Sequence, residues 1–203
     1  WRRNGRYPDH RWHRPVIIQI FNAQSNSHIL DSIENDEERK AIIQRNLNIY
    51  SNLAEYLGLF AVRSDIIGET FRITQKEDYE YVEKLYKKQN ITEKTLKKYK
   101  KYIKKTISKF DNNIKIEGRI KSKYSTFNKL NKYIKEGHND PINQISDLIG
   151  FRILTDTEKN CLSILDAIWN KGEIVITGFE DYISHPKKNG YKAMQGPVIF
   201  PEL

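Results

Sequence analysis

Three segments in the second half of the sequence combine residue types that suit a nucleotide polyphosphate. In the first segment, Arg119 and Lys121 are two residues apart, which places them on the same face of a strand. Ser125 and Lys129 follow four residues apart, which places them on the same face of a helix. One arginine, two lysines and a hydroxyl group can therefore converge on a phosphate chain, and the planar guanidinium can stack on a base. Taken alone, this pattern is weak, because basic residues are common where a strand meets a helix.

The second segment places Asp147 just before an apolar run that contains Gly150 and Arg152. A carboxylate at this point suits Mg²⁺, which prefers one or two carboxylates together with phosphate oxygens. Asp147 and Arg152 are five residues apart, so a regular strand would direct them to opposite faces. Either Asp147 lies outside the strand, or a bulge at Gly150 shifts the register. Taken alone, a turn-capping aspartate and an exposed arginine are the better interpretation.

The third segment, residues 181–191, reads DYISHPKKNGY. Its proline and its Asn-Gly pair predict a turn that presents Lys188, Asn189 and Tyr191 together. The aromatic ring can stack on a purine, which contributes ~1–3 kcal/mol, and the lysines can neutralise phosphates. An ordinary polar loop is the alternative interpretation.

The elements that must position these segments follow from the spacing of apolar residues. Alternation from residue 113 onward and the apolar run at 147–154 predict strands, and shorter strands are predicted at 173–176 and 197–200. Helical spacing and capping residues predict helices over 37–57, 77–89, 92–110, 124–136 and 158–170. Residues 1–15 predict an irregular tail, and residues 16–21 predict a strand or a buried helical segment. The fold class predicted is α+β, with a mixed, mostly antiparallel sheet flanked by helices and preceded by a helical region.

The net charge of +9 is concentrated in one part of the chain. Residues 84–109 contain eleven lysines and a single acidic residue, Glu93, so the rest of the chain is close to neutral. A solvated helix face and a surface that contacts phosphates or the ribosome are both open interpretations.

Cysteine content and hydropathy narrow the class of protein further. The single cysteine, Cys161, excludes an internal disulfide and fits a reducing compartment. No apolar run approaches the ~20 residues that span a bilayer, and no signal-peptide pattern is visible. We expect a cytoplasmic protein with no membrane partner and no specific DNA partner.

Together, the segments GRIKSKYSTFNKL, DLIGFRI and DYISHPKKNGY resemble, in this order, the signature segments of the RelA/SpoT (p)ppGpp synthetase domain. The resemblance extends upstream, where RNLNIYSNLAEYLGLFAVRSDIIGETFR is similar to the helical linker of long family members. VIIQIFNAQSNSHIL is similar to the last helix of their (p)ppGpp hydrolase domain. The organisation implied is a tail with a hydrolase remnant at 1–34, a helical linker at 35–110, and a synthetase core at 111–203 with a nucleotidyltransferase-like fold.

The resemblance implies a role for each matching residue. Arg119 and Arg152 would hold the adenine of ATP between them, while its phosphates would be bound by Lys121, Ser125 and Lys129. Asp147 would be the catalytic carboxylate that holds Mg²⁺. The guanine nucleotide, GDP or GTP, would be bound by Lys188, Asn189 and Tyr191. The reaction implied is attack of its 3′-hydroxyl on the β-phosphorus of ATP, with AMP leaving, as in a GTP diphosphokinase of the stringent response.

The sequence also departs from the family pattern. The family has a Glu-containing strand that completes the Mg²⁺ site, and this strand is absent before Leu203, so we expect the synthetase core to be truncated at its C-terminus. The chain begins at Trp1, so we expect it to be a fragment. The tetrad 178–181 matches neither family version, and Gln195 stands where the family has a phosphate-contacting histidine. Asn22 replaces a hydrolase aspartate, so we expect no hydrolase activity from this chain.

Three hypotheses follow from these residues. The first is a (p)ppGpp synthetase, active in the intact protein and with little or no turnover in this chain. The second is a nucleotide-binding regulatory module that has lost catalysis. The third is an RNA-contacting domain led by the lysine-rich helix. ATP and GDP or GTP are the expected ligands, and the ribosome is a candidate partner of a longer parent protein.

Overall fold

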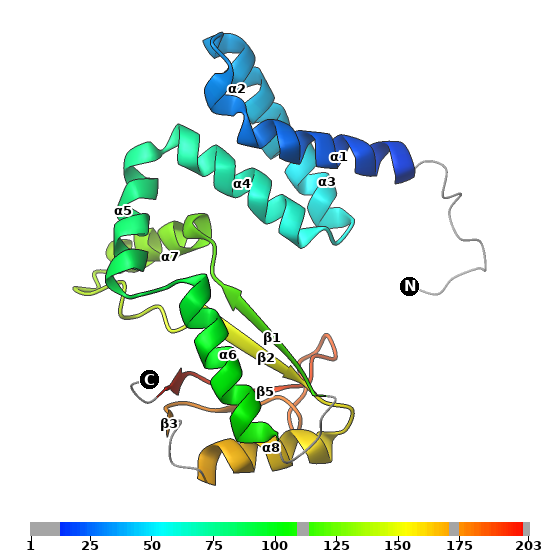
Figure 1. Ribbon diagram of the computed structural model, residues 1–203, viewed down its shortest axis with the longest axis vertical. Helices are drawn as coiled ribbons and strands as arrows, with labels where there is room; N and C mark the ends of the chain where they lie inside the picture. The colour runs from blue at the N-terminus through cyan, green and yellow to red at the C-terminus, as the bar shows by residue number, and fades with distance from the viewer. Residues whose placement is uncertain (1–12, 109–113, 171–174, 201–203) are drawn as a thin grey trace. The chain divides into compact units, whose positions relative to one another are not determined.

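The computed structural model describes residues 13–108, 114–170 and 175–200 (Figure 1). The chain divides into two compact units, one from residues 1–83 and 122–128 and the other from residues 84–121 and 129–203. The described part of the first unit is helical, whereas the second combines helices with small antiparallel sheets. The predicted α+β class is therefore confirmed. Within the described ranges, the helices are too short or too polar to span a membrane.

The first unit is built from helices that follow one another along the chain. Asn35 caps α2, because its side-chain oxygen accepts hydrogen bonds from the N–H groups of Glu37 (3.0 Å) and Glu38 (3.2 Å). The prediction of an irregular tail is wrong from His13 onward, since α1 begins there, and residues 1–12 lie outside the described part. The helical elements are α1 (His13–His28), a 3₁₀ turn (Leu30–Ser32), α2 (Asp36–Arg45), a π-helical turn (Asn46–Tyr50), α3 (Ser51–Tyr56), α4 (Phe60–Thr74) and the first part of α5 (Lys76–Lys88).

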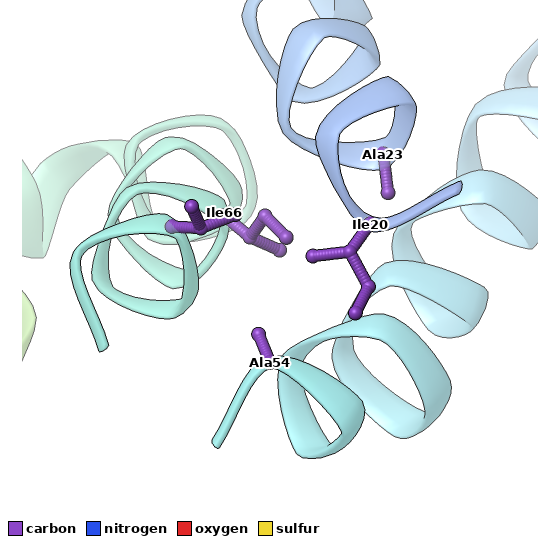
Figure 2. Close-up of a cluster of buried hydrophobic side chains, with 5 residues drawn as sticks. Ile20, Ala23, Ala54 and Ile66 are labelled. Atoms are coloured by element: carbon purple, nitrogen blue, oxygen red, sulfur yellow. The ribbon is translucent and has the colours of Figure 1, made fainter. Parts of the chain in front are cut away.

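Small and branched apolar side chains form the core of these helices. Figure 2 shows Ile20 and Ala23 of α1 facing Ala54 of α3 and Ile66 of α4. Ile20, Ala54 and Ile66 are fully buried. The apolar run at 16–21 is thus a helical segment and not a strand, because its buried side chain lies on a helix face that packs against two other helices.

The second unit contains the end of α5 and, within the described ranges, all the strands. Thr92 caps α6, since its hydroxyl accepts from the N–H of Thr95. The last turns of α7 also belong to this unit, and its first turns belong to the other one. The elements are α6 (Glu93–Ile107), β1 (Lys115–Ile120), α7 (Lys123–Lys135), β2 (Ile149–Leu154), α8 (Glu158–Asn170), β3 (Val175–Ile176), β4 (Glu180–Asp181), β5 (Met194–Gln195) and β6 (Val198–Ile199).

The strands pair two by two in antiparallel orientation. β1 pairs with β2 over six residues, whereas β3–β6 and β4–β5 each pair over two. In place of one mixed sheet, the described residues therefore form three two-stranded antiparallel sheets. Pro197 separates β5 from β6, and a proline has no N–H with which to continue a ladder.

Alternation along the β1–β2 pair gives it one buried and one exposed face. Ile116 is buried in a cluster with Ile103 and Ile107 of α6 and Ile164 of α8. The residues next to it in β1, Lys115 and those at alternate positions after it, point to the other side. The core of this unit thus fixes a strand pair whose second face is open and charged.

Candidate functional site

Two arginines lie on the exposed face of the β1–β2 pair. Arg119 is opposite Gly150, and Arg152 is opposite Glu117. Because residues two apart in a strand share a face, Arg119 and Arg152 are diagonal neighbours on the same side of the sheet. The side chain of Arg119 passes over Gly150, where its Nε and Cγ atoms lie 3.7 and 3.8 Å from the position that a Cβ would take. The side chain of Arg119 thus reaches across to the partner strand.

Asp147 lies outside β2, in the turn before its first residue, Ile149. The register of β1 and β2 is unbroken through Gly150, so the strand has no bulge there. Of the two alternatives predicted, a position of Asp147 outside the strand is therefore the correct one, and a bulge at Gly150 is not. The strand ladder is extended by the N–H of Lys121, which donates to the carbonyl of Leu148 at 2.9 Å.

Each oxygen of Asp147 accepts a hydrogen bond from a lysine. Nζ of Lys121 lies 2.9 Å from Oδ2, and Nζ of Lys129 lies 3.0 Å from Oδ1. Lys121 directly follows β1, Lys129 lies on α7, and Asp147 precedes β2. Three separate elements thus bring one carboxylate and two ammonium groups into direct contact, next to the strand pair that carries the two arginines.

The electrostatics of this cluster favour an ionised carboxylate. Partial burial raises the pKa of Asp147, but the hydrogen bonds and charges of Lys121 and Lys129 outweigh it, so the pKa lies below its usual value. Two ammonium groups and one carboxylate leave an excess positive charge. Such a cluster attracts phosphate and, by itself, repels a free cation.

Ser125 lies in the first turn of α7, one helical turn before Lys129 as predicted. Its hydroxyl accepts a hydrogen bond from the hydroxyl of Ser122 at 2.8 Å, and its N–H donates to the same Ser122 oxygen at 3.2 Å. Ser122 therefore caps the helix that carries both predicted phosphate-binding residues.

The predicted turn in residues 181–191 is present, between β4 and β5. Gly190 has a φ of +80°, and its N–H donates to the carbonyl of Lys187 at 2.8 Å. The side-chain oxygen of Asn189 accepts from the N–H of Tyr191 at 3.1 Å, so Asn189 shapes the loop, while Lys188 is exposed in it. This geometry explains the Asn-Gly pair without a ligand.

Sequence reasoning missed the contacts that hold the tyrosine of this loop. The hydroxyl of Tyr191 donates to Oε1 of Gln195 at 3.1 Å, and Nε2 of Gln195 donates to Oε2 of Glu180 at 2.6 Å. Nζ of Lys187 lies 4.1 Å from the ring centroid of Tyr182 and 5.5 Å from that of Tyr191. In the sequence, Gln195 stood out only as a departure from the family pattern. Its side chain links Tyr191 to Glu180 of the paired strand β4.

A second group of metal-ligating side chains lies in the first unit. His28 of α1 faces Asp65 and Glu69, one turn apart on α4, and these three are the group within the described ranges that lies close enough to share an ion. Nε2 of His28 is 2.8 Å from Oδ2 of Asp65. Glu69 already accepts from Nε of Arg72 at 2.8 Å. A neighbouring guanidinium weakens this group as a cation site, so we assign it no metal.

The lysine-rich helix α6 has the two faces that its sequence predicts. Leu96, Ile103 and Ile107 are buried, whereas the lysines from Lys94 to Lys105 are exposed. The helix thus packs on the strand pair and presents its positive charge to solvent, and Phe110 lies outside the described residues. Both interpretations of the charge, a solvated face and a phosphate contact, stay open.

Comparison with known proteins identifies part of the chain. Residues 118–201 match the family model described as "Region found in RelA / SpoT proteins". The resemblance to the RelA/SpoT family that was inferred from the three segments is therefore confirmed for these residues.

Curated relatives extend the similarity to most of the chain. A guanosine-3′,5′-bis(diphosphate) 3′-pyrophosphohydrolase of Aquifex aeolicus is 29% identical over 192 residues, which is 92% of this chain and 26% of the relative. The enzyme of the same name from Spiroplasma citri is 27% identical over 188 residues, or 92% of this chain and 24% of the relative. A GTP pyrophosphokinase of Myxococcus xanthus is 25% identical over 189 residues, or 93% of this chain and 24% of the relative. The chain thus spans about a quarter of the length of these relatives, whose names include both a pyrophosphohydrolase and a pyrophosphokinase.

Proposed function

We propose that the second unit is the core of a (p)ppGpp synthetase, which transfers pyrophosphate from ATP to the 3′-hydroxyl of GDP or GTP. The observation that carries the proposal is the placement of Arg119 and Arg152 on one open face, beside the cluster of Lys121, Lys129 and Asp147. Two guanidinium planes suit a purine base, and two adjacent ammonium groups suit the phosphates attached to it.

In this proposal the arginines bind adenine, and Lys121 and Lys129 bind the ATP phosphates. Tyr191, held by Gln195, offers its ring to guanine. The 3′-oxygen of the guanine nucleotide forms a bond to the β-phosphorus of ATP, its proton is released, and the bond from the α-phosphate oxygen to the β-phosphorus breaks, so that AMP leaves. Positioning and charge neutralisation supply the catalysis.

The resemblance also implies Mg²⁺. Whether the ion suits this site depends on the ligand atoms that Asp147 and its neighbours offer. Asp147 has the oxygen ligands that Mg²⁺ prefers, but both are hydrogen-bonded to lysines. These residues therefore fit a metal ion that shares its coordination with phosphate oxygens. Asp147 would hold it, and the ion would neutralise charge on the transferred group.

A nucleotide-binding regulatory module is the second candidate, and Gln195 favours it. A histidine can donate a charged hydrogen bond to phosphate, whereas the amide of Gln195 is committed to Glu180 and Tyr191.

Activity separates the two candidates. The full-length gene product with ATP, GDP and Mg²⁺ should yield AMP and ppGpp in equal amounts, and Asp147→Asn should abolish both. ATP binding without any product would instead support the regulatory module.

Binding separates both candidates from an RNA-contacting domain. Titration of the chain with fluorescent ATP should show binding that Arg152→Ala removes and that the charge-matched Arg45→Ala, on an exposed turn of α2, leaves unchanged. Affinity for a single-stranded RNA should be the same in all three proteins. An Arg152→Ala variant that still binds ATP as tightly as the unmodified chain would contradict the site.

A further inference from the structure

The two lysines that face Asp147 are less exposed than the carboxylate they contact. The exposed fraction is 17% for the side chain of Lys121, 31% for Lys129 and 41% for Asp147. A partly buried ammonium group needs a counter-ion, because the loss of its hydration is otherwise uncompensated. Asp147 is therefore the counter-ion of both lysines, and one of its oxygens contacts each of them.

The same two ammonium groups are the ones that the proposed function assigns to the ATP phosphates, and the present inference rests on that assignment. A triphosphate that binds Lys121 and Lys129 would compete with the Asp147 carboxylate for their N–H groups. If the triphosphate carries no metal ion, the displaced carboxylate is left beside further negative charge, which is unfavourable at such short range. If it carries a divalent ion, that ion gives the carboxylate a new positive partner.

We propose that Asp147 discriminates between the two forms of the nucleotide: it competes with metal-free ATP for Lys121 and Lys129, and it binds metal-loaded ATP. The cluster then couples the binding of nucleotide and metal, so that each strengthens the other. This goes beyond a ligand role for Asp147, since a residue that only holds Mg²⁺ has no effect on nucleotide bound without it.

The test measures ATP affinity by calorimetry with excess EDTA and again with excess Mg²⁺, for the 203-residue chain and for Asp147→Asn. The unmodified chain should bind ATP at least about fivefold more tightly with Mg²⁺ than with EDTA. In Asp147→Asn, the affinity in EDTA should rise at least about fivefold, and the effect of Mg²⁺ should shrink to about twofold or less. Asp156→Asn removes an exposed carboxylate from the loop after β2 and should behave as the unmodified chain.

Each outcome decides the matter. If Asp147→Asn binds metal-free ATP no more tightly than the unmodified chain, while both bind ATP, the competition is refuted and the proposed function stands. If Asp156→Asn gains the same affinity, the effect is one of general charge and the inference also fails. If the unmodified chain binds no ATP under either condition, the proposed nucleotide site fails, and the inference fails with it. Circular dichroism spectra identical to that of the unmodified chain show that each variant is folded.

Discussion

The ring of Phe151 lies directly across the β1–β2 pair from Gly118, on the face opposite the arginines. A Cβ added to Gly118 would meet Cε1 of Phe151 at 3.1 Å and Cδ1 of Leu96 at 3.1 Å. Phe151 in turn packs edge-to-face on Phe200, with ring centroids 5.9 Å apart. The missing side chain at 118 thus lets an aromatic ring and α6 close over the strand that carries Arg119.

Gly118→Ala should destabilise the second unit, because neither the ring nor the helix can withdraw without loosening the core. We expect a loss of about 1–3 kcal/mol in the free energy of unfolding, measured by urea denaturation. Gly150→Ala is the matched control on the partner strand, since its Cβ would meet only the flexible Arg119 side chain at ordinary contact distance. An equal loss in both variants would contradict the packing described for Gly118.

Gly68→Ala should stabilise the first unit. Gly68 lies inside α4, and a Cβ there would have no neighbouring atom within 4 Å. Alanine lowers the conformational entropy of the unfolded chain and favours the helix, so we expect a gain of about 0.5–1 kcal/mol. Thermal unfolding followed by circular dichroism measures it. An unchanged or lower melting temperature would show that position 68 is constrained by something other than helix propensity.

The Asp147 cluster should make stability depend on pH in a defined direction. The pKa of Asp147 is lowered in the folded state by its two lysines, despite partial burial, so its contribution to stability is present above the unfolded value of about 3.9 and is lost as the pH falls through the lower folded pKa. The free energy of unfolding of the unmodified chain should therefore fall, relative to that of Asp147→Asn, as the pH is lowered from 5 to about 2. Urea denaturation at several pH values tests this, with Asp156→Asn as control. A difference that is the same at all pH values would show that the ion pairs do not contribute to stability.

The hydrogen bond from Tyr191 to Gln195 should affect the binding of the guanine nucleotide and not the binding of ATP. Tyr191→Ala removes the stacking ring and should weaken GDP binding by about 5- to 150-fold, which corresponds to ~1–3 kcal/mol. Gln195→Ala keeps the ring but frees its hydroxyl from the β4–β5 pair, so a smaller loss of about two- to fivefold is expected from one exposed hydrogen bond. Calorimetric titration with GDP and with ATP compares the variants. A loss of ATP affinity equal to the loss for GDP would contradict the assignment of this loop to guanine.

Sequence periodicity was sufficient for most local structure. The amphipathic α6, the alternation in β1 and the turn at Gly190 all depend on interactions within a few residues of chain, so the order of residue types is enough to predict them. The three segments likewise identified the RelA/SpoT region, since their residue types and spacing are themselves sequence properties.

Tertiary structure decided what the sequence left open. Whether Asp147 stands in or before its strand depends on the register with β1, and its two lysine partners lie 26 and 18 residues away along the chain. The same holds for Gln195, whose side chain joins Tyr191 to Glu180 only because β4 and β5 pair. Spacing along a chain specifies which residues share a face of one element, but the contacts between elements arise when their apolar faces pack, and it is these contacts that set the charge and the hydrogen bonding of the candidate site.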